Sequence, residues 1–257
     1  MIYAFSFIMG AVFGSFLNAA EWRIHREVPL LSRKRSECPR CGELIPFFLN
    51  IPIISFLVLR GSCRFCKKKI SKQYIYVELA LAFLFALAVF VKGGFESWSL
   101  LSFVGLLRDW FIIGIFSFIF LYDFKYGQVL DSVTLLGSLF ISLISAGLGL
   151  LSWTSMAWGA LLGSGFFFIQ FIISKGKWIG GGDLRIGLFM GVALGWPLVA
   201  VALFLSYTIG ALFSLVSIVF GKKQMTDKVA FGTYLSVGSI IALFWGDSLL
   251  NWYLSLL

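Results

Sequence analysis

Long apolar stretches recur along the whole chain and constrain its fold more than any other feature. A helix needs about 20 apolar residues to cross a bilayer. Only 13% of the 257 residues are charged, against roughly 25% in soluble domains, and the mean hydropathy is +0.95. We therefore expect an all-α polytopic membrane protein with about eight transmembrane helices. The stretches cover residues 1–20, 74–91, 100–122, 129–151, 157–173, 184–195, 197–220 and 229–245.

Three of these stretches carry special features. Residues 1–20 lack a basic segment and a small-residue cleavage pattern, which favours a retained first span over the alternative of a cleaved signal peptide. The third stretch contains Arg108 and Asp109, which predicts an interfacial helix followed by a span from about Trp110. The sixth stretch is short, so we expect it to begin inside the bilayer or in a cavity.

The basic residues predict the orientation in the membrane. Twelve of the 21 Lys and Arg residues lie between Arg23 and Lys72, and the loops after the third, fifth and seventh stretches are also basic, whereas the opposite loops hold only Lys92. The positive-inside rule then makes these loops cytoplasmic and both termini extracytoplasmic. The net charge of +9 could also indicate nucleic acid, but this distribution favours topology and anionic lipid headgroups; we expect no nucleic-acid partner. The other loop lysines are Lys125, Lys175, Lys177, Lys222, Lys223 and Lys228.

All four cysteines lie in the polar insert formed by residues 21–73. They form two Cys-x-x-Cys pairs, Cys38 with Cys41 and Cys63 with Cys66. An insert of this size is too small for a robust core without a cross-link, and the spacing is typical of a tetrahedral four-thiolate zinc site. Such a closed site has no open position for water, so the predicted zinc is structural. Reduced cysteines without metal are the alternative.

Two aspartates lie at the ends of apolar stretches, where a charge usually marks function. Asp123 falls in the segment 122–131, which we expect to be a short cytoplasmic turn, and Asp183 follows three glycines, at or near a helix N-terminus. Two carboxylates brought together can share a proton and activate water. The alternatives are an interfacial role for Asp123, helix capping by Asp183, and a proton-coupled transporter.

A larger ordered set of motifs resembles the type IV prepilin peptidases, also called leader peptidases and N-methyltransferases of type IV pili, type II secretion and competence systems. The resemblance covers nearly the whole chain. The set comprises Gly14-Ser15-Phe16-Leu17-Asn18, both cysteine pairs, Asn50-Ile51-Pro52, Leu59-Arg60-Gly61, Ile70-Ser71, Val77-Glu78-Leu79, the segment around Asp123, Gly180-Gly181-Gly182-Asp183 and Phe231-Gly232.

The resemblance implies a membrane aspartic endopeptidase with Asp123 and Asp183 as its catalytic pair, and with Asp131, Gly180 and Gly182 in supporting roles. Such enzymes cut the basic leader from prepilins or pseudopilins at the cytoplasmic face of the bacterial inner membrane. They commonly methylate the new N-terminus with S-adenosyl-L-methionine. Peptidase activity without methylation is the alternative. Candidate methyl-donor residues, at motif-matching positions, are Asn18, Arg60 and Glu78.

The expected domains are a first transmembrane helix (1–20), a cytoplasmic zinc-ribbon-like insert associated with methyl transfer (21–73) and a membrane-embedded aspartyl peptidase (74–257). The sequence departs from the family pattern at several places, one of which is the polar segment Ala20-Glu21-Trp22-Arg23. Leu130 stands where a proline often precedes the second aspartate of the first motif, and Thr233 follows Phe231-Gly232 where the family often has proline. The competing classes are a proton-coupled transporter and a zinc-ribbon membrane adaptor.

Overall fold

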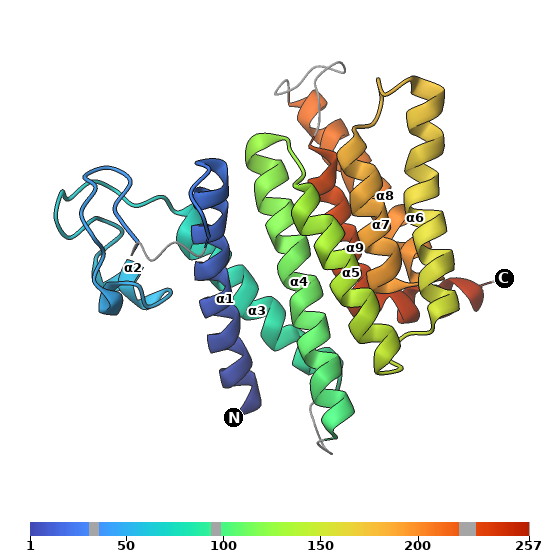
Figure 1. Ribbon diagram of the computed structural model, residues 1–257, viewed down its shortest axis with the longest axis horizontal. Coiled ribbons are helices and arrows are strands. Elements are labelled where there is room, and N and C mark those ends of the chain that lie inside the picture. The colour runs from blue at the N-terminus through green and yellow to red at the C-terminus, as the bar shows by residue number, and fades with distance from the viewer. Residues whose placement is uncertain (31–35, 94–98, 221–229, 257) are drawn as a thin grey trace. The chain divides into compact units, whose positions relative to one another are not determined.

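The computed structural model describes residues 1–30, 36–93, 99–220 and 230–256, and the long elements in this part of the chain are all helices (Figure 1). The chain divides into two compact units, Met1–Ser97 and Trp98–Leu257. The all-α membrane architecture expected from the sequence is therefore confirmed.

The first unit consists of two long helices and the polar insert between them. α1 (Ile2–His25) packs along α3 (Gln73–Val91). Glycines on α1 allow the two backbones to approach closely. A Cβ atom at Gly14 would lie 2.7 Å from Glu78 Cα, and one at Gly10 would collide with the backbone of Leu81. The insert contains only a 3-10 turn, η1 (Phe47–Leu49), and a short helix, α2 (Ile54–Val58).

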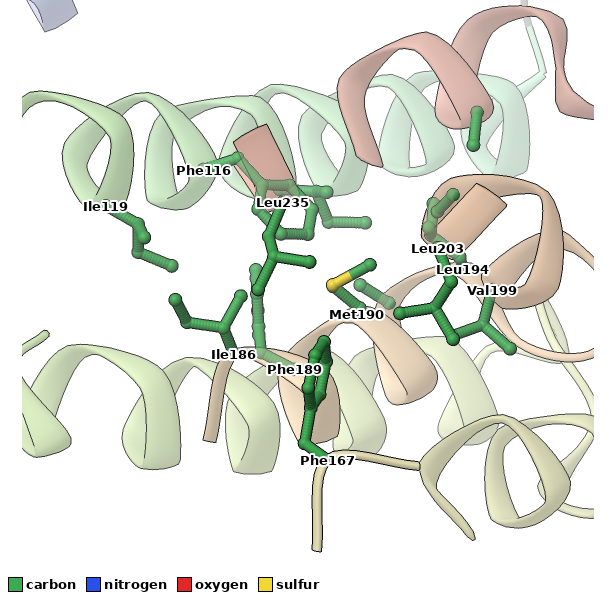
Figure 2. Close-up of a cluster of buried hydrophobic side chains, with 14 of the residues drawn as sticks. Phe116, Ile119, Phe167, Ile186, Phe189, Met190, Leu194, Val199, Leu203 and Leu235 are labelled. Atoms are coloured by element: carbon green, nitrogen blue, oxygen red, sulfur yellow. The ribbon is translucent and has the colours of Figure 1, made fainter. Parts of the chain in front are cut away.

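The second unit is a bundle in which a short helix has the central place. α7 contacts α5, α6, α8 and α9, and Figure 2 shows Ile186, Phe189 and Met190 of α7 in the same cluster as Phe116 of α4 and Leu235 of α9. All five side chains are fully buried. The helices are α4 (Leu100–Tyr126), α5 (Asp131–Gly147), α6 (Trp153–Ser174), α7 (Gly181–Leu194), α8 (Leu198–Val219) and α9 (Phe231–Leu254).

Each of the eight apolar stretches forms a helix, but only six helices in the described part of the chain have the length and hydropathy of a span: α1, α3, α4, α6, α8 and α9. α5 has 17 residues and α7 has 14. The shortness expected of the sixth stretch is therefore confirmed. At 1.5 Å per residue a 14-residue helix reaches about 21 Å, less than the hydrocarbon core of a bilayer.

The expectation of a separate interfacial helix before a span from about Trp110 is wrong, because α4 is one continuous helix of 27 residues. Arg108 is tolerated within it since its guanidinium is buried among partners. The Arg108 Nε atom donates to Ser145 Oγ at 2.9 Å, and the guanidinium Nη2 atom donates to the Ala193 carbonyl near the end of α7. The Asp109 carboxylate lies within ion-pair distance of Arg108 at 3.4 Å. A cation at a helix C-terminus is also favoured by the helix dipole.

The helix that precedes the insert extends past residue 21, where the insert was expected to begin. α1 continues to His25, and Glu21 is only 2% exposed within it. The Gln73 side chain, at the start of α3, donates to the Glu21 carboxylate at 3.2 Å. A partner from a distant segment thus allows a charged residue to extend the helix beyond the apolar stretch.

Glycines allow α6 and α7 to pack backbone against backbone (Figure 1). A Cβ atom at Gly163 of α6 would collide with the carbonyl oxygen of Gly187 of α7 and lie 3.0 Å from its carbonyl carbon. Neither contact can be relieved by a side-chain rotation, because both atoms belong to the backbone. The position of α7 in the bundle therefore depends on this pair of glycines.

Substitution Gly163→Ala should lower the free energy of unfolding by about 1–3 kcal/mol through overpacking, measured as a lower thermal unfolding midpoint in detergent. The matched control is Gly165→Ala on the same helix, where an added Cβ meets no atom within 4 Å and the midpoint should stay the same or rise. Equal midpoints for the two variants would contradict the contact.

Candidate functional site

Four helix ends meet at one end of the second unit. Asp123 lies in the last helical turn of α4, and Asp131, Asp183 and Thr233 lie in the first turns of α5, α7 and α9. The expected turn over residues 122–131 is therefore shorter than predicted. α4 continues to Tyr126 and ends at Gly127, whose φ of +62° closes the helix with an N–H bond of 2.8 Å to the Asp123 carbonyl.

Asp123 is held by the first turn of α9. Its side chain is buried, and its Oδ2 accepts the Thr233 backbone N–H at 2.9 Å and the Thr233 hydroxyl at 3.3 Å. Gly232 permits this approach, because a Cβ there would lie 2.9 Å from the same oxygen and 2.8 Å from Ile186 Cδ1. The Phe231-Gly232 motif thus has a direct structural reason: any side chain at Gly232 would displace the carboxylate.

Asp183 is the third residue of α7, which confirms its expected place at a helix N-terminus. Its Oδ2 accepts the backbone N–H of Gly180 at 3.2 Å. Gly182 packs against the turn that follows α4, since a Cβ there would lie 2.9 Å from both Cβ and Cγ2 of Val129. The charge of Asp123 acts on Asp183, so the fold brings the two aspartates together from positions 60 residues apart in the sequence.

Asp131 does not join this pair directly. It is exposed and forms an ion pair with Arg185, which lies one helical turn after Gly181 on α7. The pair connects the N-terminal turns of α5 and α7 beside the two aspartates. Tyr207 of α8 also lies within reach of the Asp183 charge, and its hydroxyl hydrogen-bonds with Gln170 of α6 at 3.1 Å.

The paired carboxyl groups have a defined chemical capacity. Two neighbouring carboxylates cannot both ionise cheaply, so one keeps a proton near neutral pH while the other accepts one. Water between such groups can be deprotonated and delivered to a carbonyl carbon. The N-termini of α5, α7 and α9 add the positive ends of three helix dipoles, which favour negative charge at this place.

The four cysteines form a second cluster, in the first unit. Their sulfur atoms all lie within 4.8 Å of one another. A tetrahedral ion with four metal–sulfur bonds of about 2.3 Å requires sulfur separations of about 3.8 Å, so small movements would complete the site. The cluster could therefore hold a metal ion, as the spacing predicted.

The two halves of this cluster share one backbone design. In each half, an N–H after the second cysteine returns to the carbonyl of the first: Gly42 to Cys38 at 2.9 Å and Lys67 to Cys63 at 3.0 Å. Gly42 has a φ of +74° and Lys67 a φ of +59°. The second half therefore uses a lysine in the left-handed region that usually favours glycine.

The pKa values of two of the cysteine thiols are shifted in opposite directions. The pKa of Cys63 is lowered to about 7 by the backbone amides of Cys66 and Phe65. The pKa of Cys41 is raised to about 11, because loss of hydration and the neighbouring Cys38 and Cys66 thiols outweigh the stabilising Glu43 amide. Four thiolates close together thus need a cation to neutralise them, which a bound metal ion would supply.

The three residues proposed for the methyl donor occupy different surroundings. Asn18 is buried on α1, where its amide nitrogen donates to the Tyr74 carbonyl at 3.2 Å. Glu78 is buried on α3, and its Oε2 accepts the Ile53 N–H at the start of α2 at 2.7 Å. Arg60 is exposed just after α2. The structure therefore places Asn18 and Glu78 where α1, α3 and the insert join, and Arg60 on the surface.

Sequence reasoning missed Glu21 and the role of Thr233. Glu21 joins Gln73 and Asn18 in a buried polar cluster, in which Gln73 also donates to Asn18 Oδ1 at 3.4 Å. The only sequence signal for Thr233 was its departure from a frequent proline. Its contact with Asp123 spans 110 residues and leaves no local pattern.

The fold and site define a polytopic membrane protein with an aspartate pair in one unit and a four-thiol cluster in the other; Asp123 is buried and Asp183 partly buried. Two family models match the chain. The bacterial peptidase A24 N-terminal domain covers residues 8–92, and the type IV leader peptidase family covers residues 110–215.

Curated relatives match over almost their whole length. A prepilin leader peptidase/N-methyltransferase of Aeromonas salmonicida strain A449 is 30% identical over 99% of this chain and 94% of its own. The protein of the same name from Bacillus subtilis is 30% identical over 97% of this chain and 97% of its own. The one from Pseudomonas aeruginosa is 29% identical over 96% of this chain and 91% of its own. This chain belongs to the type IV leader peptidase family. No solved structure gives a significant match.

Substitution Gly182→Ala should reduce leader cleavage by about 10- to 100-fold, because the added Cβ would push the N-terminus of α7, and with it Asp183, away from Val129. The matched control is Gly181→Ala, where a Cβ meets no atom within 4 Å. Initial cleavage rates of purified variants measure the effect. Adding Val129→Ala removes one of the two close contacts and should partly restore the rate; equal rates for both glycine variants would argue against the contact.

Proposed function

We propose that this chain is a membrane aspartic endopeptidase that removes the leader peptide of type IV prepilins or pseudopilins, with Asp123 and Asp183 as its catalytic pair. The observation that carries this proposal is the meeting of the two aspartates across α4, α7 and α9, with each carboxylate held by a backbone N–H. Family membership independently supports leader cleavage.

Cleavage proceeds by direct attack of water. The ionised carboxylate takes a proton from the water, whose oxygen attacks the carbonyl carbon of the last leader residue. The protonated carboxyl polarises the carbonyl oxygen, and the new amine leaves with a proton. Because water is the nucleophile, no acyl-enzyme forms. Gly180, Gly182 and Asp131 support the pair: the glycines through the N-terminus of α7, and Asp131 through its ion pair with Arg185.

The proposed location is the bacterial inner membrane, with the aspartate pair at the cytoplasmic face and both termini extracytoplasmic. The basic loops support this orientation, among them Lys125 and the pair Lys175 and Lys177. Lys222, Lys223 and Lys228 also contributed to the expectation, but they lie outside the described residues. The substrate is an apolar helix with a charged leader, which presents its cut site at this membrane boundary.

Replacing Asp123 or Asp183 with asparagine should reduce leader cleavage by at least about 10³-fold, because asparagine can neither take nor give the required proton. The measurement is conversion of a prepilin to its shortened form by purified protein in detergent or liposomes. Asp247→Asn, at an exposed position of α9, serves as the matched control and should cut normally. Full activity in either catalytic variant would reject the assignment.

We also propose that the cysteine cluster holds one structural Zn²⁺ and that the chain methylates the new N-terminus. Sulfur atoms within 4.8 Å of one another suit a thiolate site, and zinc is the common ion for four cysteines. When bound, it cross-links the insert and has no open position for chemistry. The names of the relatives support methyl transfer.

Arg60 and Glu78, two of the residues proposed to bind S-adenosyl-L-methionine, carry charges opposite to charged groups of this cofactor. Arg60 is exposed and could meet its carboxylate, while Glu78 carries the charge opposite to its ammonium and sulfonium groups. Glu78 and Asn18 already have protein partners, which favours a role in shaping the junction of α1, α3 and the insert. When bound, this cofactor supplies the methyl group, and the chain holds the accepting amine near it. These residues belong to the first unit, like the zinc cluster.

Zinc loss should therefore separate the two activities. Cys63→Ser should lower bound zinc from about one ion per chain and reduce methyl transfer, because the cross-link of the insert is lost. Leader cleavage should continue, since the aspartates lie in the other unit. Metal analysis, a cleavage assay and transfer of label from S-adenosyl-L-methionine to cut pilin provide the readouts. Arg64→Ala, exposed between two ligands, is the control. Wild-type protein that transfers no label would identify a peptidase without methylation.

A further inference from the structure

Thr233, in the first turn of α9, is in direct contact with Asp123. Its N–H lies 2.9 Å and its hydroxyl 3.3 Å from the same carboxylate oxygen. Both residues are buried, with 7% and 5% of their surfaces exposed. Proline could make neither bond, because it lacks an N–H and a hydroxyl. Thr233 therefore holds Asp123 with two donors, one from its backbone and one from its side chain.

The two aspartates are not held equally. Asp123 receives two donors from Thr233, and the Gly232 amide also acts on it. Asp183 accepts a bond from the Gly180 N–H at 3.2 Å. Hydrogen bonds to an ionised acceptor are shorter and stronger than bonds to a neutral one, and the first amides of a helix have no partner within it. These contacts favour the negative charge on Asp123.

The titratable and charged groups around the pair come from several helices. From α8, Tyr207 lies within reach of the Asp183 charge, and its hydroxyl hydrogen-bonds with Gln170 of α6. From α7, Asp183 interacts with Asp123 directly. Asp131 of α5 and Arg185 of α7 are paired with each other. In the first turn of α9, Tyr234 packs against Gly210 of α8. On α4 itself, Lys125 lies over the Tyr126 ring at 5.2 Å. The difference in hydrogen-bond donors between the two aspartates favours ionisation of Asp123 over Asp183.

We propose that Thr233 is a positioning residue that keeps Asp123 ionised, so that Asp123 is the general base and Asp183 the general acid. This inference rests on the proposed function. As the water oxygen bonds to the carbonyl carbon, its proton passes to Asp123, and the Asp183 proton passes to the carbonyl oxygen. When the C–N bond breaks, the amine nitrogen takes the proton from Asp123, and Asp183 recovers its own from the collapsing hydroxyl.

The test is the dependence of kcat/KM for leader cleavage on pH in variants of Thr233. Thr233→Val removes the hydroxyl but keeps the N–H, and Thr233→Pro removes both donors. The acidic limb should move to higher pH by about half a unit in the first and about one unit in the second, while the basic limb stays in place. Thr233→Ser retains both donors, and its profile should overlay that of the wild type.

Ser239→Ala provides a matched control, because Ser239 has a buried hydroxyl on α9 that donates to the Leu235 carbonyl of its own helix at 2.7 Å. Its profile should not move. A uniform fall in rate with an unmoved acidic limb in Thr233→Val and Thr233→Pro would overturn the inference, as would a shift of the basic limb alone. Wild-type protein that cuts no prepilin would instead overturn the proposed function, and the inference with it.

Discussion

The placement of one buried and one partly buried carboxyl group at the end of an apolar bundle is the constraint on which the arrangement of the second unit depends. A carboxylate removed from water needs hydrogen-bond donors in its place, and side chains of this bundle offer few. The donors come instead from helix beginnings: the Thr233 amide of α9 serves Asp123, and the Gly180 amide before α7 serves Asp183. The convergence of helix ends is therefore a requirement of the site as well as a feature of the fold.

Glycine makes this convergence possible at close range. Gly232 lets the carboxylate of Asp123 reach the α9 backbone, and Gly182 lets α7 begin against the turn after α4. Further along α7, Gly187 packs on Gly163 of α6. α7 has too few residues to span a bilayer, yet it is surrounded by four helices. Close backbone contact with its neighbours compensates for this shortness and fixes the place of Asp183.

The first unit is organised by a different constraint. Its insert has little regular structure, and its η1 and α2 contain no buried residues. The four thiols lie close enough together to hold one metal ion, and such an ion would provide the cross-link that apolar burial does not. The buried Glu78 adds a second attachment by accepting the N–H of Ile53, a residue in the left-handed region with a φ of +63°. The middle of the polar insert is thus attached to α3 by this hydrogen bond.

The sequence alone determined those features that depend on local pattern: the eight helical segments, the shortness of the sixth, the cysteine cluster, and Asp183 at a helix beginning. Hydropathy, ligand spacing and glycine content are properties of neighbouring residues. Only the tertiary structure decided that α4 runs unbroken through Arg108, that Glu21 is buried in α1, and that Thr233 holds Asp123. In each case the charge is accommodated by partners that lie 37 to 110 residues away, and hydrogen bonds between such distant segments leave no trace in local composition.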